Sequence, residues 1–174
     1  AMQHYYAVIM AGGGGTRLWP LSRQAQPKQS IQLLGDETLF QIAVRRLQPL
    51  FMPDKVFVVT SAAYRDLLHR QAPDVPLENF IVEPAPRGTA PALGLAALTL
   101  RRRDPLAVMA CLTADHFIAD EARFRGVLAA AHEMALKDYL VTLGIAPTYA
   151  ATGFGYIQRG AALGDAQGLS VYRA

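Results

Sequence analysis

A single cysteine, Cys111, occurs among the 174 residues, and long runs of apolar residues are missing. One cysteine cannot form a disulfide within the chain, which fits the reducing conditions of a cytoplasm. The longest apolar stretch, 90–100, is far shorter than the roughly 20 residues that a membrane-spanning helix needs. The N-terminus lacks the basic region and cleavage site of a signal peptide, and Ala1 in front of Met2 looks like a remnant of cloning. These absences favour a cytoplasmic protein that does not enter a membrane.

The chain also has little net charge and no HExxH metal-binding motif. The net charge is only +3, and no basic face with interleaved aromatic residues is recognisable, so nucleic-acid binding is not expected. The densest basic run, Arg101-Arg102-Arg103, ends a predicted helix, where cations suit the helix dipole. None of the four histidines forms the HExxH pair of a zinc hydrolase. Cys111 lies in an apolar run, so we expect a buried structural thiol and not a nucleophile.

What the sequence does contain is a regular alternation of short apolar runs with runs of helical periodicity. The composition, with 52% hydrophobic and 18% charged residues, is typical of a soluble globular domain. Alternating strands and helices predict a Rossmann-like α/β fold with a doubly wound, mostly parallel sheet. Ser61 and Thr89 are expected to cap two of the helices. We expect strands at 7–10, 55–60, 80–82, 107–112 and 140–143, helices at 38–50, 61–70, 89–103 and 121–137, a loop at 161–168, and the start of an unpartnered strand at 170–173.

Unusual segments follow three of the predicted strands. A glycine run, 12–15, follows the first strand, Glu83-Pro84 follows the third, and Thr113-Ala114-Asp115 follows the fourth. Ligands of doubly wound sheets bind beyond the carboxyl ends of the strands. The sequence therefore predicts a binding site at this edge of the sheet.

The glycine run matches neither of two familiar phosphate-binding motifs. A Walker loop needs a lysine and a hydroxyl residue after its last glycine, where this chain has Thr16 and Arg17, and the dinucleotide fingerprint needs glycine at position 17. What remains is a loop without side chains, whose N–H groups can approach an anion, followed by the cations of Arg17 and Lys28. We interpret this segment as a phosphate-binding loop; the alternative is a loose turn with surface charges.

Five segments carry a resemblance to a known family. GGGGTRLWPLSR followed by PK, within 12–28, resembles the signature of the sugar-1-phosphate nucleotidylyltransferases, and LWPLSR resembles the mannose-1-phosphate guanylyltransferase branch. The resemblance implies a nucleotidyltransferase domain over residues 1–174 whose C-terminal part is missing, because the family's FVEKP segment and a later metal-binding aspartate do not occur. The other segments, in family order, are GDETLFQ at 35–41, VEPAPRGTAPA at 82–92, LTADHFI at 112–118 and GIAPTYAATGFGYIQRG at 144–160.

The resemblance implies a magnesium-dependent transfer of a nucleotidyl group from GTP to mannose 1-phosphate, which gives GDP-mannose and pyrophosphate. It implies catalytic roles for Arg17, Lys28 and Asp115, with Asp115 as the ligand of Mg²⁺. The alternative for Asp115 is a carboxylate that caps the next turn. A nucleotide-binding role is implied for Ala11, Gly12, Gly13, Gly14, Gly15, Thr16, Glu83, Arg87, Gly88 and Thr89, and a sugar-binding role for Thr152, Gly153, Phe154, Gly155 and Tyr156.

Glu83 suggests how the base is selected. A carboxylate can accept hydrogen bonds from the N1–H and 2-amino groups of guanine, a pair of neighbouring donors that adenine lacks. We hypothesise that Glu83 selects guanine; the alternative is a glutamate in a surface turn. Three positions depart from the family pattern, which usually has Asn in place of Gly88, Tyr in place of Phe154, and Asn or Ser in place of Gly14.

Other functions stay open at this point. The same chemistry could use glucose 1-phosphate with UTP or dTTP, or the chain could be a noncatalytic module that binds a nucleotide sugar. A nicotinamide-dependent oxidoreductase would share the sheet, but the third glycine of its fingerprint is missing. We expect GTP and mannose 1-phosphate as partners, binding of nucleotide with little turnover by these residues alone, and a homo-oligomer as an open option for the full-length protein.

Overall fold

The computed structural model describes residues 2–12, 30–32 and 35–174. The chain divides into two compact units, Ala1–Glu121 and Ala122–Ala174. The first unit contains the sheet and the pocket that the sequence predicts at its edge, and the second contains a helix and a hairpin. No helix among the described residues is long and apolar enough to cross a membrane.

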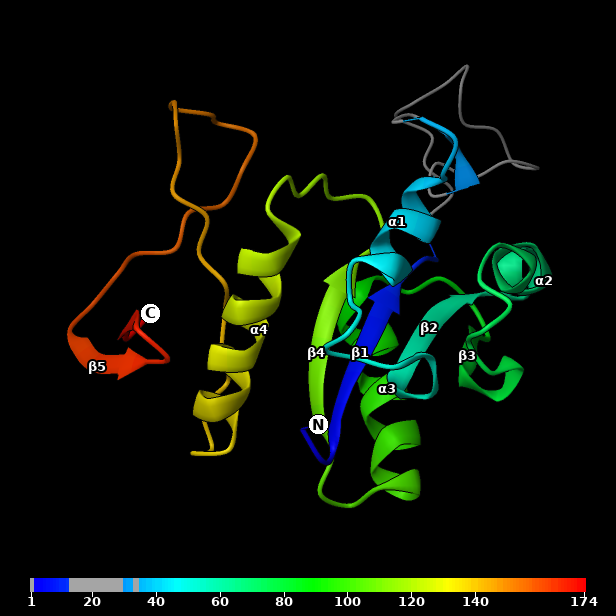
Figure 1. Cartoon of the computed structure of the whole chain (residues 1–174), viewed down its shortest axis with the longest axis horizontal. Helices are drawn as coiled ribbons and strands as arrows, with labels where there is room; N and C mark the ends of the chain where they lie inside the picture. Colours follow the sequence, from blue (N-terminus) through cyan, green and yellow to red (C-terminus); the bar gives the residue numbers. More distant parts are fainter. Residues whose placement is uncertain (1, 13–29, 33–34) are drawn as a thin grey trace. The chain divides into compact units, whose positions relative to one another are not determined.

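Four parallel strands form the sheet of the first unit (Figure 1). Their order is β3-β2-β1-β4, so the chain continues from β1 to one side of it and later returns to the other side. In doubly wound sheets this reversal marks the place where ligands bind. The predicted α/β class and four of the five predicted strands are confirmed. The strands are β1 (Tyr5–Met10), β2 (Val56–Ser61), β3 (Phe80–Glu83) and β4 (Val108–Thr113).

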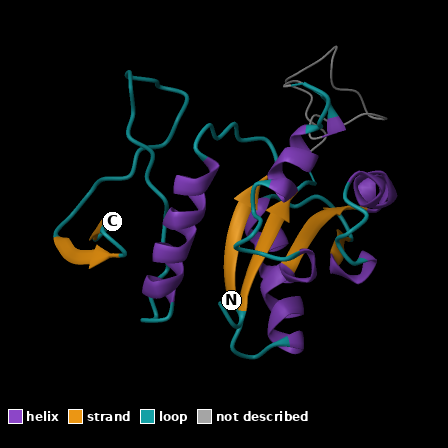
Figure 2. Cartoon of the chain, viewed as in Figure 1, coloured by secondary structure: helices purple, strands orange, loops and turns teal. Residues whose placement is uncertain are grey.

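Helices lie on both faces of this sheet, as Figure 2 shows, with α3 behind it and α1 in front. Tyr6 and Val8 point to the α3 face, where they pack against Ala96 and Leu100. Tyr5 points the other way and contacts Phe51, with 4.6 Å between ring centroids. The three helices are α1 (Leu39–Arg45), α2 (Ala62–Gln71) and α3 (Thr89–Arg103), and short 3₁₀ turns cover Pro53–Lys55 and Leu77–Asn79.

The two central strands are buried on both faces, which explains their continuous apolar sequences. Val8 and Ile9 of β1 and Val58 and Val59 of β2 are fully buried. The outer strand β4 has a described neighbour on one side only, and Cys111 in it is exposed. The prediction of a buried thiol was therefore wrong, because the apolar run around Cys111 forms an outer strand and not a central one.

Two predicted helix boundaries were also wrong. The cap of α3 is Gly88 and not Thr89, which forms the first residue of the helix. Helix α1 ends at Arg45, although its periodicity suggested a helix up to Leu50. Beyond Arg45 the bonds tighten, since Leu47 and Gln48 donate to the carbonyls three residues back, and Pro49 then keeps Gln48 from resuming the helix.

The second unit contains α4 (Glu121–Ala135), whose first residue belongs to the first unit, and a hairpin of β5 (Ala162–Ala166) and β6 (Leu169–Tyr172). The hairpin packs on the helix through Ala130, Met134 and Ala166. Its strands are antiparallel and joined by Gln167 and Gly168, both with positive φ, which is the geometry of a tight type I′ turn.

Three sequence predictions for the second unit need correction. Residues 161–168 were expected to form a loop but contain β5, and this strand is the partner that 170–173 was expected to lack. Residues 140–143 are not a strand, because no strand among the described residues pairs with them. Leu140 is fully exposed there.

Candidate functional site

A pocket of about 300 Å³ lies at the carboxyl edge of the first unit's sheet. The ends of β1, β3 and β4 and the first turns of α3 surround it. This is the edge at which the sequence predicted a binding site, and the pocket brings five of the predicted site residues together. The lining residues are Met10, Gly12, Glu83, Pro86, Gly88, Thr89, Ala92, Thr113, Ala114 and Asp115.

The chain leaves β1 in a fixed direction. The N–H of Ala11 donates to the carbonyl of Val59 at 2.8 Å, and the buried hydroxyl of Thr60 donates to the carbonyl of Ala11 at 3.1 Å. Both backbone groups of Ala11 are thus held by β2. Because Ala11 is anchored in this way, Gly12 is delivered to the pocket at a definite place.

Gly12 and Glu83 lie against each other inside the pocket. A Cβ atom added to Gly12 would stand 2.6 Å from Oε2 of Glu83, closer than any ordinary contact. Glu83 is placed by the end of β3, which pairs with β2 through Ser61 and Glu83. The missing side chain at position 12 therefore makes room for this carboxylate, and both groups face the same small volume.

Gly88 forms the entrance to α3. Its backbone angles are φ 91° and ψ −177°, in a region that only glycine adopts readily. A Cβ at this position would meet nothing within 4 Å, so backbone strain and not a clash would oppose a side chain. The first turn of a helix has N–H groups without helical partners, which favour a negative charge. Thr89 lines the pocket, whereas Arg87 is exposed and does not.

Asp115 reaches the pocket from the turn after β4, together with Thr113 and Ala114. The lining thus contains two carboxylates, those of Glu83 and Asp115, and no basic side chain among its described residues. Binding a triphosphate here would require cations from residues outside this lining.

Six predicted residues, Gly13, Gly14, Gly15, Thr16, Arg17 and Lys28, lie outside the residues that the structure describes. The predicted sugar loop, 152–156, lies in the second unit. The hydroxyl of Tyr156 closes this loop, because it accepts from the N–H of Ala151 at 2.8 Å and donates to its carbonyl at 3.0 Å. Phe154 is 71% exposed.

The apolar part of the pocket was not predicted from the sequence. Met10 and Ala92 line it, and each also belongs to a core strand or helix. Met10 could have been found as the last residue of the first strand, next to the glycines. Nothing in the sequence distinguishes Ala92 from the other alanines of α3.

The carboxylate oxygens of the pocket can hold a hard cation such as Mg²⁺ only if a bound ligand supplies further oxygens. No group of three or more His, Cys, Asp or Glu side chains among the described residues could hold a metal ion. Mg²⁺, however, usually takes one or two carboxylates and completes its shell with phosphate oxygens and water. Asp115 fits that requirement, because its carboxylate is at the pocket and oxygen is its donor.

Comparison with known proteins gives a consistent result. Residues 6–170 match the family described as "Nucleotidyl transferase". A mannose-1-phosphate guanylyltransferase of Escherichia coli K12 is 44% identical over 164 residues, and one of Sinorhizobium fredii is 42% identical over 159 residues. These alignments cover 92% and 90% of this chain but only 34% and 31% of the relatives, so the chain spans about a third of their length.

Solved structures show the same similarity in the fold. A protein of Thermus thermophilus named mannose-1-phosphate geranyltransferase superposes with a TM-score of 0.67 at 32% identity, covering 76% of this chain and 38% of that protein. A protein of Helicobacter pylori named mannose-6-phosphate isomerase gives a TM-score of 0.70 at 22% identity, covering 87% of this chain and 54% of the other. The second match concerns the fold alone.

Proposed function

Because the chain belongs to the nucleotidyl transferase family, we propose that it forms the nucleotide-binding part of an enzyme that converts GTP and mannose 1-phosphate to GDP-mannose and pyrophosphate. The observation that carries this proposal is the pocket at the reversal of strand order, into which Gly12, Glu83 and Asp115 converge. The names of the similar proteins support the choice of substrates. The proposal includes a cytoplasmic location, in line with the single cysteine.

In the proposed reaction, a phosphate oxygen of mannose 1-phosphate attacks the α-phosphorus of GTP. A new bond forms between that oxygen and the α-phosphorus, the bond from the α-phosphorus to the oxygen bridging it to the β-phosphorus breaks, and pyrophosphate leaves with the electron pair. Both reactants are anions, so the main requirements are correct positioning and neutralisation of charge. No side chain needs to act as a nucleophile.

We assign the phosphates of GTP to the glycine loop that continues from Gly12. Ala11 is anchored to β2, so the first glycine is held at the edge of the pocket. The N–H groups of Gly13 to Thr16, with those at the start of α3 at Gly88 and Thr89, are the proposed anion donors. The proposed cations are Arg17 for the β- and γ-phosphates and Lys28 beside them, and Arg87 is proposed at the outer rim.

We assign Mg²⁺ to Asp115, whose carboxylate faces the pocket. When bound, Mg²⁺ would offset negative charge on the phosphate oxygens. The role of Asp115 is to present an ionised oxygen at the pocket, while the ligand supplies further oxygens.

We assign selection of the base to Glu83. Its carboxylate lies against the backbone of Gly12, so a base stacked into the pocket would meet a fixed acceptor. Two acceptor oxygens match the two neighbouring donors of guanine, N1–H and the 2-amino group. The loop from Thr152 to Tyr156 is the proposed sugar-binding segment, because its glycines allow a hexose to approach the backbone.

Titration calorimetry of the 174-residue chain with nucleotides tests the proposal. We expect GTP to bind in the presence of Mg²⁺, at least about 10-fold more tightly than UTP, ATP or CTP. We also expect Asp115→Asn to reduce the gain in GTP affinity that Mg²⁺ gives, while leaving binding in EDTA nearly unchanged. Equal affinity for all four nucleotides would contradict the assignment of Glu83, and failure to bind any nucleotide would contradict the function.

A second function, binding of nucleotide sugar without catalysis, is supported by one observation. The chain spans about a third of the length of the relatives that it matches. Release of pyrophosphate from GTP and mannose 1-phosphate by the chain alone separates the two functions. We expect nucleotide binding with little turnover; rapid turnover would exclude the noncatalytic alternative.

A further inference from the structure

Arg46 is a charged residue buried within the first unit. It directly follows α1, where its N–H donates to the carbonyl of Ile42 at 3.0 Å, and only 2% of its surface is exposed. Burying a guanidinium is costly unless its N–H groups are paired. The burial of Arg46 therefore raises the question of which groups its charge and its N–H donors hold in place.

Its guanidinium holds the turn that follows β4. Nη1 donates to the carbonyl of His116 at 2.5 Å, and Nη2 donates to the carbonyl of Thr113 at 3.3 Å. These two carbonyls lie on either side of Ala114 and Asp115 in the sequence. Ala114 is 4% exposed, so the base of the turn is buried, while Asp115 faces the pocket. The planar guanidinium of Arg46 is thus hydrogen-bonded to both ends of the segment that carries the Asp115 carboxylate.

The charge of Arg46 also acts on this segment. Burial lowers the pKa of Arg46, whereas the carboxylates of Glu121 and Asp115 raise it. Arginine remains protonated in proteins because its ordinary pKa is far above neutrality. A permanent positive charge therefore lies near the carboxylate of Asp115.

We propose that Arg46 is a positioning residue, which fixes the turn 113–116 and thereby the direction in which the Asp115 carboxylate enters the pocket. The inference rests on the proposed function, in which Asp115 holds Mg²⁺. It requires arginine and not merely a cation, because two N–H groups of one rigid plane reach two separate carbonyls. A lysine at position 46 could keep the charge, but it could not keep the hydrogen bonds to both carbonyls.

The neighbouring Arg45 provides a matched control. It is the last residue of α1, directly before Arg46, and carries the same charge, but it is about half exposed and forms ion pairs with Glu37 and Glu121 at 3.0 and 3.2 Å. Removal of Arg45 changes the net charge as much as removal of Arg46 does. Among the contacts described, however, it leaves the hydrogen bonds to Thr113 and His116 intact.

The experiment measures GTP affinity in Mg²⁺ and in EDTA for the wild type, Arg46→Met, Arg46→Lys, Arg45→Met and Asp115→Asn. We expect Arg46→Met to lose about 10-fold or more of the gain that Mg²⁺ gives, with less than about a 3-fold change in EDTA. Arg46→Lys should fall between Arg46→Met and the wild type. Arg45→Met should keep the full gain. Hydrogen–deuterium exchange without ligand should be faster at residues 113–118 in both Arg46 variants and unchanged in Arg45→Met.

The outcomes separate this inference from the proposed function. If the wild type gains nothing from Mg²⁺, or if Asp115→Asn keeps the gain, the assignment of Asp115 fails and the inference fails with it. If those two proteins behave as expected but both Arg46 variants keep the Mg²⁺ gain, the positioning role is overturned while the function stands. Should Arg46→Met fail to fold, Arg46→Lys decides, because it retains the charge and most of the bulk.

Discussion

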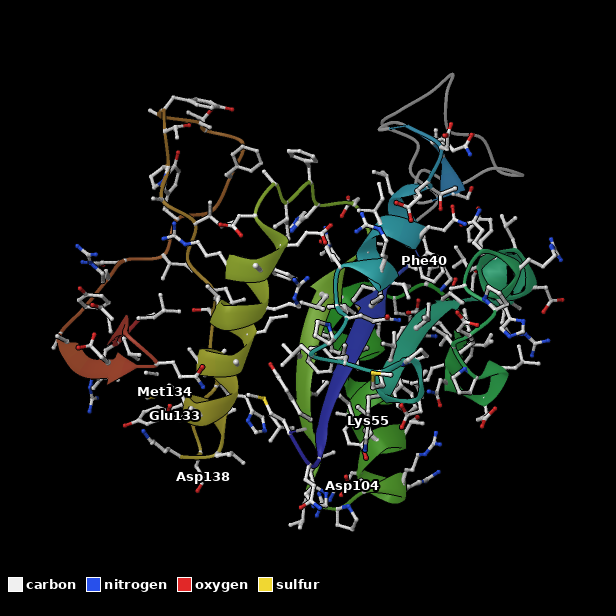
Figure 3. All side chains as sticks on the ribbon, viewed as in Figure 1. Phe40, Lys55, Asp104, Glu133, Met134 and Asp138 are labelled. Carbon is white, nitrogen blue, oxygen red and sulfur yellow. The ribbon has the colours of Figure 1, made fainter. Side chains whose placement is uncertain are left out.

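The two edges of the four-stranded sheet use polar side chains in different ways. At the amino edge, His4, Tyr6, Lys55 and Asp104 bond to one another, and Figure 3 labels Lys55 and Asp104 at this end. At the carboxyl edge, the carboxylates of Glu83 and Asp115 face a pocket. The strands are the same four, so the difference comes from the segments that enter and leave them.

Hydrogen bonds at the amino edge are numerous and short. The hydroxyl of Tyr6 donates to Asp104 at 2.7 Å, Nδ1 of His4 lies 2.7 and 2.9 Å from the two oxygens of Asp104, and Nζ of Lys55 donates to the Tyr6 hydroxyl at 3.1 Å. This network joins residues at the start of β1 and β2 to the segment before β4. The polar groups of this edge are hydrogen-bonded to one another, so we expect the edge to contribute to the stability of the fold.

The carboxyl edge instead surrounds the pocket. Its glycines, Gly12 and Gly88, remove side chains where the backbone meets the pocket, and its carboxylates are only partly buried. Segments that bind ligands are drawn from the less stabilised parts of a fold. Substitutions at the amino edge should therefore change stability and spare binding, and substitutions at the carboxyl edge should do the reverse.

The largest effect is expected for Asn79→Ala at the amino edge. Asn79 is fully buried, donates to the carbonyls of Val56 at 2.9 Å and Asp54 at 3.1 Å, and accepts from Nη1 of Arg103 at 2.7 Å. Its loss leaves buried groups without partners, which should lower the free energy of unfolding by about 2–4 kcal/mol. Urea unfolding measures this loss. GTP affinity of the folded protein should change by less than about 2-fold, and a large change would break the division between the edges.

Glu83→Gln at the carboxyl edge should give the next largest effect, on binding. Glutamine keeps the size of the side chain but replaces one acceptor oxygen with a donor, which opposes the two donors of guanine. We expect the preference for GTP over UTP to fall by about 10–100-fold, the value of a charge-assisted pair of hydrogen bonds. The free energy of unfolding should change by less than about 0.5 kcal/mol. An unchanged preference, measured by calorimetry with both nucleotides, would defeat the assignment.

Gly88→Asn tests a position at the pocket that we expect to matter for stability as well as for binding. The resemblance places asparagine here, but φ of 91° with ψ of −177° strains any side-chain-bearing residue. We expect a loss of about 1–2 kcal/mol in the free energy of unfolding, since the space for a Cβ is open and only the backbone resists. Gly94→Asn, within α3 and with equally open space, is the control for helix propensity. Equal losses in the two variants would remove the special role of the Gly88 backbone.

The parts of the fold that could be predicted are those fixed by local pattern. Val58 and Val59 lie in a short, β-branched apolar run that is typical of a strand buried on both faces, and the edge at which such strands end follows from their parallel order. For that reason Gly12, Glu83 and Asp115 could be placed at one site from the sequence alone.

The remainder depends on contacts that the sequence does not reveal. Residues 161–168 look like a loop in the sequence, yet pairing with β6 across a two-residue turn makes 162–166 a strand. Arg45 and Arg46 are indistinguishable as neighbours in a sequence, but one is exposed and the other is buried beneath the turn of Asp115. The burial of Arg46 results from tertiary packing, which the periodicity of the residues in α1 does not reveal.

The smallest effect is expected for Asp104→Asn at the amino edge, and it should depend on pH. Hydrogen bonds from Tyr6 and His4 and from the N–H of Leu106 lower the pKa of Asp104, although partial burial opposes the shift. A carboxyl whose pKa is lower in the folded protein contributes stability above its unfolded pKa, and that contribution disappears as pH falls through the folded value. The difference in unfolding free energy between wild type and Asp104→Asn should therefore be full at pH ~5 and shrink below pH ~4. Urea unfolding between these limits measures it. A difference that stays constant with pH would mean that the charge of Asp104 contributes nothing to the stability of this network.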